Sequence, residues 1–251
     1  MNIYTIYIMF SIPSTTIEYE NTKTELCKIG EKYGTDKSPY NNKKFIHGGE
    51  GHRHPYTCYY DSIFKNLKNK NITFAEIGIL LGDSIRMWRE YFTKAKIIGL
   101  NDVLDKHNTN VSNCSFQHID VKSVNSITNI FDKYKKFDII IDDASHKFND
   151  QINVINVAYK YLNDNGILII EDIFEDKNIF MKYNCEKYAN MSFFDENQKK
   201  QALNLSIENL YLKNIENISH HYKTIEFVSV RHNNSYTPGW NNNKLLILKK
   251  N

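Results

Sequence analysis

Two stretches decide the fold of this chain: FDIIIDDASH at Phe137–His146 and GILIIED at Gly166–Asp172. The first begins with a β-branched run that is typical of a strand buried on both faces of a parallel sheet. The second is also an apolar run, and it ends abruptly in two acids. Residues 149–162 between them have helical apolar spacing, so the two stretches predict one β–α–β unit with carboxylates just beyond its strands.

The alternation of strand and helix continues on both sides of this unit. Upstream, the pattern predicts strands at 72–77, 95–100 and 114–119, and helices at 23–33 (ended by Gly34), 59–67, 85–92 (capped by Asp83 or Ser84) and 124–134. Downstream, it predicts a turn at Asn165–Gly166, a helical region at 196–217 with Leu203, Ile207, Leu210 and Tyr211 on one stripe, and a hairpin of residues 225–230 and 245–248. The prediction is therefore an open α/β sheet, mostly parallel, with helices on both faces and an antiparallel strand near one edge.

The composition limits the class of protein. Of 251 residues, 41% are hydrophobic and 24% are charged, which is ordinary for a globular domain and excludes a disordered, fibrous or collagen-like chain. A mean hydropathy of −0.54 and the lack of an apolar run near twenty residues argue against a membrane-spanning helix. The net charge of +3 is too balanced for a protein that coats nucleic acid.

The N-terminus and the cysteines suggest a cytoplasmic protein. Residues 1–14 are apolar but have no basic region and no small-residue cleavage site, so we interpret them as a leader or short edge element and not as a signal peptide. The four cysteines are widely spaced without a C-x-x-C pair, which favours free thiols in a reducing compartment over disulfides or a zinc site.

Acidic residues follow two successive predicted strands, where open α/β sheets bind their ligands. Neighbouring strands lie about 4.8 Å apart, so Asp143, Glu171 and Asp172 are expected to converge at one edge of the sheet. Carboxylates this close repel unless they are protonated or share a cation, and their oxygens suit Mg²⁺ or another divalent ion. The alternative is that these acids cap the helices that follow them.

His146 stands three residues after Asp143 and is the histidine best placed for chemistry. A histidine beside a metal-held hydroxyl is a candidate general base, while the structural alternative is a helix-start imidazole bonded to the backbone. His47, His52 and His54 lie in a glycine-rich loop without acids or cysteines at ligand spacing, so we interpret that loop as a cover over the site.

Several motifs together resemble a known family. They are GTDKS at Gly34–Ser38, HPYT at His54–Thr57, EIGILLGDSIRMWREYF from Glu76, FDIIIDDASH from Phe137, and IIED ending at Asp172. They are similar to class I S-adenosylmethionine-dependent methyltransferases of the macrocin and mycinamicin sugar O-methyltransferase type, over residues 27–175. The resemblance implies a Rossmann-like fold with a seven-stranded sheet completed by the C-terminal hairpin. The sequence has no internal repeat and no linker, so we expect one domain over 1–251, divided into an N-terminal helix and cover loop (1–58), a cofactor-binding core (59–172), an acceptor-side helical insert (173–222) and the hairpin (223–251).

The resemblance assigns roles to individual residues. Asp143, Glu171 and Asp172 would hold Mg²⁺ or another divalent cation, and His146 would be the catalytic base acting with Asp143. The cofactor S-adenosylmethionine would border Glu76, Gly78 and Gly82, with Asp120 near the adenine and Asp142 near the amino end. The family usually has an acid after the second strand to hold the ribose; this chain has Asn101 there, followed by Asp102.

The resulting hypothesis is a metal-dependent O-methyltransferase that acts on a sugar hydroxyl in glycan or glycoside biosynthesis. Its partner would be a sugar-containing small molecule or glycan, with no nucleic acid, no membrane span and a possible homo-oligomer. A methyltransferase of catechol-like molecules and a catalytically silent cofactor- or glycan-binding relative remain as alternatives. An NAD-dependent enzyme is disfavoured because the turn at Gly78–Gly82 lacks the G-x-G-x-x-G spacing.

Overall fold

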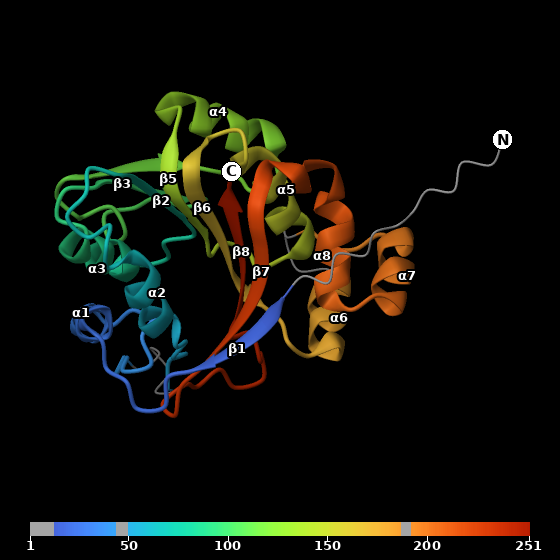
Figure 1. The fold of residues 1–251 in the computed structure, drawn as a ribbon, viewed down its shortest axis with the longest axis horizontal. Coiled ribbons are helices and arrows are strands. Elements are labelled where there is room, and N and C mark those ends of the chain that lie inside the picture. The colour runs from blue at the N-terminus through green and yellow to red at the C-terminus, as the bar shows by residue number, and fades with distance from the viewer. Residues whose placement is uncertain (1–12, 44–49, 187–191) are drawn as a thin grey trace.

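The computed structural model describes residues 13–43, 50–186 and 192–251. Within them, one eight-stranded sheet runs through the molecule in the order β1-β7-β8-β6-β5-β2-β3-β4 (Figure 1). Neighbouring strands are parallel except β8, which runs antiparallel to both β6 and β7. The strands are β1 (Ser14–Glu18), β2 (Thr73–Ile77), β3 (Lys96–Asn101), β4 (Cys114–His118), β5 (Phe137–Asp142), β6 (Leu162–Ile173), β7 (Tyr222–Arg231) and β8 (Lys244–Lys250). The predicted fold class is confirmed.

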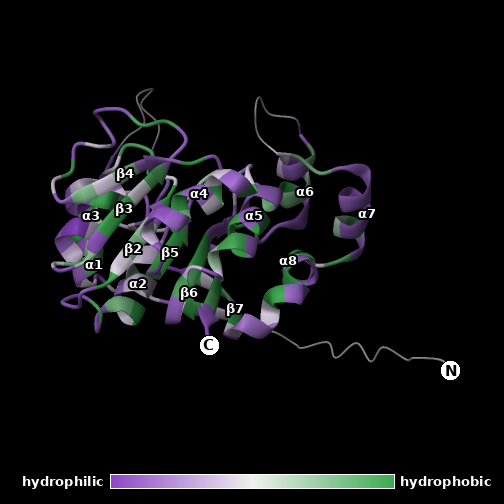
Figure 2. Ribbon diagram, turned by 90° about the horizontal axis from the view of Figure 1, so that it is seen from above, coloured by the Kyte–Doolittle hydropathy of each residue, from purple (hydrophilic) through white to green (hydrophobic). Residues whose placement is uncertain are grey.

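Helices cover both faces of this sheet (Figures 1 and 2). α1 (Glu25–Tyr33), α2 (Tyr56–Phe64) and α3 (Asp83–Tyr91) share one hydrophobic cluster with the sheet, and α4 (Val124–Tyr134), α5 (Phe148–Ala158) and α8 (Ile207–Ile215) share the other. α6 (Lys177–Cys185) and α7 (Glu196–Asn204) extend the second layer, and a 3-10 turn, η1 (Glu216–His221), leads into β7.

The alternation of side chains along buried strands explains the two-sided core. In β5, Ile139 and Ile141 pack in the cluster of α1–α3, whereas Ile140 packs in the cluster of α4, α5 and α8. All three side chains are fully buried. Successive residues of a strand point to opposite faces, so a sheet covered on both sides needs the continuous apolar run seen here.

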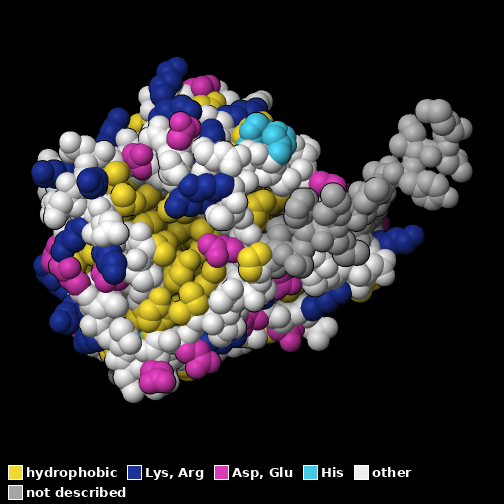
Figure 3. All heavy atoms as spheres, viewed as in Figure 1, with side chains coloured by type: hydrophobic (Ala, Val, Ile, Leu, Met, Phe, Trp, Pro, Cys, Tyr) yellow, Lys and Arg dark blue, Asp and Glu magenta, His cyan; other side chains and the backbone are white. Residues whose placement is uncertain are grey.

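One region of the molecular surface is apolar. Figure 3 shows apolar side chains gathered between α2 and the strands β6–β8, on the face seen in Figure 1. The partly buried Ile63 of α2, Leu67 of the turn after α2 and Ile167 of β6 belong to the cluster beneath. None of the described helices is both long enough and apolar enough to cross a membrane.

Several local predictions differ from the structure. Residues 13–14 of the predicted N-terminal element are described, and Ser14 begins β1, which pairs with β7 and adds an eighth strand to the sheet. Residues 1–12 and His47 lie outside the described residues. Asn165 and Gly166 lie within β6, where the register with β5 shifts, instead of forming a turn before it. All four cysteines are free thiols, as predicted.

Two helix predictions also need correction. The N-cap of α3 is Gly82 in a left-handed conformation, and Ser84 lies inside the helix with its hydroxyl donating to Glu76. The helical region at 196–217 is broken at Leu205, because Ser206 caps a new helix by accepting the N–H of Asn209. Leu203 is therefore off the predicted stripe and is 65% exposed, while Ile207, Leu210 and Tyr211 are buried.

Gly78, in the turn that follows β2, contacts the acidic motif that follows β5. Its φ is +86°, and a Cβ built on it would lie 2.1 Å from the backbone oxygen of Asp143. The N–H of Asp143 in turn donates to the Ile77 carbonyl at 2.8 Å. The missing side chain therefore lets the two loops touch, and this contact sets the position of Asp143.

We expect Gly78→Ala to lower the free energy of unfolding by about 3 kcal/mol or more, from left-handed strain plus overpacking. Gly239→Ala is the matched control, because Gly239 has a φ of +79° but nothing within 4 Å of the added Cβ. In the control, only the left-handed strain should lower the free energy of unfolding, by about 1–2 kcal/mol. Urea unfolding of both variants measures the difference, and equal losses would show that the contact with Asp143 does not constrain the turn.

Candidate active site

A pocket of about 1140 Å³ opens at the carboxyl ends of β2–β5. Seven of the residues predicted for function line it, namely Gly78, Asn101, Asp102, Asp120, Asp143, His146 and Asp172. The other four, Glu76, Gly82, Asp142 and Glu171, are absent from its wall. Three of these four are acids that are at most 2% exposed, so the acidic residues form a buried layer and a layer that faces the pocket.

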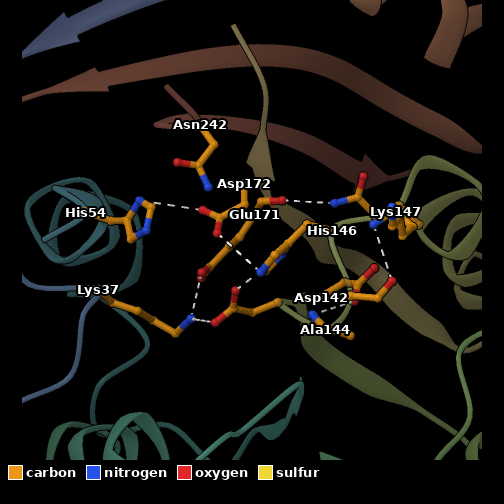
Figure 4. Close-up of polar contacts among 12 residues, drawn as sticks. Lys37, His54, Asp142, Ala144, His146, Lys147, Glu171, Asp172 and Asn242 are labelled. Carbon is orange, nitrogen blue, oxygen red and sulfur yellow. Dashed lines mark hydrogen bonds and ion pairs between the residues drawn. The ribbon is translucent and has the colours of Figure 1, made fainter. Parts of the chain in front are cut away.

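Lys37 lies at the centre of the buried layer (Figure 4). Its ammonium forms ion pairs with Asp143, with Glu171 at 2.6 Å and with Glu76 at 3.2 Å. Burial alone would lower the pKa of Lys37, but these carboxylates outweigh it and raise that pKa well above its usual value. The ammonium therefore stays charged and neutralises part of the acidic cluster.

α2 supplies two tyrosines to the same acids. The hydroxyl of Tyr56 donates to Asp172 Oδ1 at 2.7 Å, and the hydroxyl of Tyr60 donates to Glu171 Oε1 at 2.6 Å. Because these tyrosines are four residues apart, they share one face of the helix. Helix α2 thus holds the two consecutive acids of β6 in separate orientations.

The backbone of β6 is irregular where these acids stand. The register of β6 with β8 shifts between Ile170 and Ile173, and Asp172 has a φ of +58°. His146, which faces it, also has a positive φ of +55°. Left-handed backbone is strained for residues other than glycine and tends to occur at functional sites.

His146 and Asp172 meet at the wall of the pocket. His146 Nε2 lies 3.5 Å from Asp172 Oδ2, and its Nδ1 lies 3.9 Å from Asp143 Oδ1. One donor atom from each of Asp143, His146 and Asp172 lies within 4.8 Å of the others, which is a spacing that suits a metal ion. Nδ1 of His146 is buried without a hydrogen-bond partner among the described residues.

Burial affects the charge of the acids differently. It is the main cause that raises the pKa of Asp143, and it raises that of Glu171 well above its usual range. For Asp172, burial is opposed by His54, His146 and the Tyr56 hydroxyl, which together lower its pKa. His54 lies 3.6 Å from Asp172 and stacks on Tyr56. Asp172 is thus the acid of this group whose surroundings favour the ionised form.

Asn101 and Asp102 have different surroundings at the end of β3. The Asn101 side chain accepts the N–H of Ile79 at 3.1 Å and donates to the Val103 carbonyl at 2.7 Å, so both ends of its amide bind the backbone. Asp102 is exposed and lines the pocket. The carboxylate of Asp102 is therefore free of these backbone contacts, whereas the amide of Asn101 is held by them at the wall of the pocket.

Sequence reasoning missed Lys37, Tyr56, Tyr60 and Trp240. Lys37 belongs to the quoted GTDKS motif, but the acids that it pairs with, Asp143 and Glu171, lie 106 and 134 positions away. Trp240 lines the pocket from the β7–β8 loop and stacks on Phe174, with ring centroids 6.0 Å apart. No local pattern relates such distant residues. The signals that the sequence offered were the positions of Lys37 in GTDKS and of Tyr56 in HPYT, two of the quoted motifs.

Comparisons with known proteins agree with this geometry. No protein-family model matches the chain. It is 28% identical to mycinamicin VI 2''-O-methyltransferase of Micromonospora griseorubida over 159 residues, which are 60% of this chain and 36% of that protein. It is 30% identical to demethylmacrocin O-methyltransferase of Streptomyces fradiae over 131 residues, 49% of this chain and 33% of that one. The predicted resemblance to sugar O-methyltransferases is confirmed.

Solved structures show the same fold. MycE methyltransferase from the mycinamycin biosynthetic pathway, in complex with Mg and SAH, matches with a TM-score of 0.62 at 18% identity, over 92% of this chain and 55% of MycE. The chain has the Rossmann-like class I methyltransferase fold. It spans about a third of the length of the curated relatives and about half of MycE.

The buried Asp142 generates a test of these electrostatics. Burial raises its pKa to about 8, with the Ala144 N–H opposing the shift. An unfolded aspartate ionises near pH ~4, so the cost of keeping Asp142 buried grows as the pH rises from about 4 to about 8. Asp142→Asn keeps an oxygen for the Ala144 N–H and has no charge to bury. We therefore expect it to stabilise the protein more at high pH, by about 1–3 kcal/mol between pH ~5 and pH ~8.

Urea unfolding at the two pH values measures this gain. The exposed Asp164, changed to Asn, is the control and should show no such pH dependence. A gain from Asp142→Asn that is the same at both pH values would contradict the raised pKa.

Proposed function

We propose that this chain is an S-adenosylmethionine-dependent O-methyltransferase that transfers a methyl group to a sugar hydroxyl. The observation that carries this proposal is the meeting of Asp143, His146 and Asp172 at the wall of a large pocket. The pocket lies at the carboxyl edge of a class I methyltransferase sheet, where such folds bind ligands. The similarity to enzymes named as sugar O-methyltransferases supports the choice of reaction.

The cofactor is proposed to lie along the ends of β2, β3 and β4. Gly78, Asp102 and Asp120 all line this part of the pocket. Asp102 is proposed to bind the ribose hydroxyls, and Asp120 to lie near the adenine. The buried Glu76 and Asp142 would then act from beneath this surface, where burial raises the pKa of Glu76 to about 7.

The residues present fit a divalent cation. The carboxylates of Asp143 and Asp172 lie within reach of one ion, and the imidazole of His146 lies beside them. Carboxylate oxygens are suitable ligands for Mg²⁺. Asp143 and Asp172 would hold the ion, and Glu171, predicted as the third ligand, has its oxygens on Lys37 and Tyr60. Bound there, a cation supplies positive charge that orients and acidifies a sugar hydroxyl.

His146 is proposed to accept the proton of that hydroxyl. Its imidazole faces the pocket, and the nearby Asp172 carboxylate stabilises the positive charge that the ring gains. The methyl donor is already activated as a sulfonium. The chain therefore contributes mainly by aligning the hydroxyl oxygen with the methyl carbon, an effect that is worth ~7–11 kcal/mol in well-oriented systems.

The test is methyl transfer from S-adenosylmethionine to a panel of glycosides, nucleotide sugars and catechols in the presence of Mg²⁺. We expect a sugar to be methylated, and His146→Ala to lower turnover by ~10²–10⁴ while the affinity for S-adenosylhomocysteine is unchanged. Turnover and calorimetric titration measure the two quantities on the same preparation.

The outcomes separate the alternatives. Methylation of catechols alone would favour the catechol-type enzyme. Cofactor binding without transfer to any acceptor would favour a silent relative. A well-folded His146→Ala variant with near-normal turnover would exclude His146 as the base, and full turnover after chelation would remove the cation.

Trp240 is proposed to bind the apolar face of the acceptor sugar. It lines the pocket, and its ring packs against Phe174 and Tyr183. Those neighbours fix the ring, so its aromatic face is preorganised for a ligand.

We expect Trp240→Ala to raise the KM for the acceptor about tenfold, equivalent to about 1.4 kcal/mol of lost stacking and apolar contact. The affinity for S-adenosylhomocysteine should stay the same. Trp240→Phe is the control, because it keeps an aromatic face and should recover most of the loss. Steady-state kinetics with varied acceptor measures KM, and an unchanged KM in Trp240→Ala would place the acceptor elsewhere.

A further inference from the structure

Lys37 places a permanent positive charge among acids that we propose to bind a divalent cation. We infer that Lys37 is the internal counter-ion of this cluster and that its ammonium competes with a divalent cation for Asp143 and Glu171. This inference rests on one part of the proposed function, namely that a divalent cation binds at this cluster. It makes Lys37 a positioning residue that sets the affinity of the site for metal.

The loop that carries Lys37 is firmly anchored. Gly34 ends α1 in a left-handed conformation and donates to the Gly30 carbonyl at 2.9 Å. The Lys37 carbonyl accepts the N–H of Thr57 at 3.0 Å, at the start of α2. The Ser38 hydroxyl donates to the Cys27 carbonyl at 3.2 Å. The lysine is therefore aimed at the sheet edge by both helices, and its position is not that of a mobile surface side chain.

The oxygens of the acids are divided between two sides. Oδ2 of Asp143 faces Lys37, while its Oδ1 faces His146. Glu171 directs one oxygen to Lys37 and the other to Tyr60, so both are already engaged. With Lys37 in place, the carboxylate oxygens that remain on the side of the pocket are Asp143 Oδ1 and Asp172 Oδ2, both of which face the His146 imidazole.

Removal of the ammonium has two consequences that act in the same direction. The repulsion between Lys37 and a nearby divalent ion disappears, which is a large effect at short distance in a buried site. In addition, one oxygen of Asp143 and one of Glu171 lose their buried partner and become available to another cation. The uncompensated acids then bind a divalent ion more tightly than the unaltered cluster does.

The experiment titrates Mn²⁺ into the full chain and follows the signal of free Mn²⁺ by electron paramagnetic resonance. We expect Lys37→Met to bind Mn²⁺ at least tenfold more tightly than the unaltered protein. Lys244→Met is the matched control, because it also removes a buried lysine, one that pairs with Glu208 and none of these acids. Its affinity should not change, and titration with S-adenosylhomocysteine verifies that each pocket is intact.

A second variant tests the same inference without altering Lys37. If Glu171 serves Lys37 and Tyr60, Glu171→Gln in the unaltered chain should change Mn²⁺ affinity by less than threefold. In the Lys37→Met background, where Glu171 is released, the same change should weaken Mn²⁺ binding at least tenfold. A tenfold loss in the Lys37-containing chain would overturn the inference even if Lys37→Met failed to fold.

The remaining outcomes distinguish this inference from the proposed function. If the unaltered chain binds Mn²⁺ and a folded Lys37→Met variant binds it no more tightly, the competition is wrong and the proposed cation site stands. If neither protein binds Mn²⁺, both the competition and the cation are wrong, while S-adenosylhomocysteine binding still tests the methyltransferase assignment separately.

Discussion

The ion pairs of one buried lysine hold together the part of the molecule where function is expected. Lys37 joins the acids at the ends of three adjacent strands, β2, β5 and β6, to the loop between α1 and α2. Without a cation at this point, parallel strands that end in carboxylates would repel one another at the edge where their side chains meet. The tyrosines of α2 complete this arrangement by fixing the outer oxygens of Glu171 and Asp172.

This constraint separates two tasks within one group of acids. Glu76 and Glu171 are at most 1% exposed and serve the internal ion pair, while Asp143 and Asp172 are shared with the pocket. Consecutive residues of a regular strand point to opposite faces, so Glu171 and Asp172 reach partners on the same side only because β6 departs from regular geometry at Asp172. The strained backbone thus allows two neighbouring acids to act on the same side of the sheet.

Most of the fold could be predicted from the sequence because its signals are local. Continuous apolar runs predict doubly covered strands such as β5, and the capping chemistry of Ser206 explains why the predicted helix at 196–217 divides in two. The convergence of Asp143 with Asp172 also followed from strand order. The direction of Glu171 did not, because it depends on Lys37 and Tyr60, which approach from elements 134 and 111 positions away. Similarly, the hydrogen bonds of Asn101 to backbone groups are set by the shape of the turn at Ile79 and not by residue type alone.

The pairing of β8 between β6 and β7 has a consequence for how the chain reaches its native state. The hydroxyl oxygen of Tyr56 also lies 2.7 Å from the carbonyl oxygen of Asn242, just before β8, across 186 positions of sequence. During synthesis, α1 and α2 leave the ribosome long before the strands that neutralise Lys37 and bind the tyrosine hydroxyls. Contacts of such high sequence separation form late, since loop closure must be paid for first. The contacts between the N-terminal helices and the acidic edge of the sheet can therefore be complete only after β8 has paired with β6 and β7.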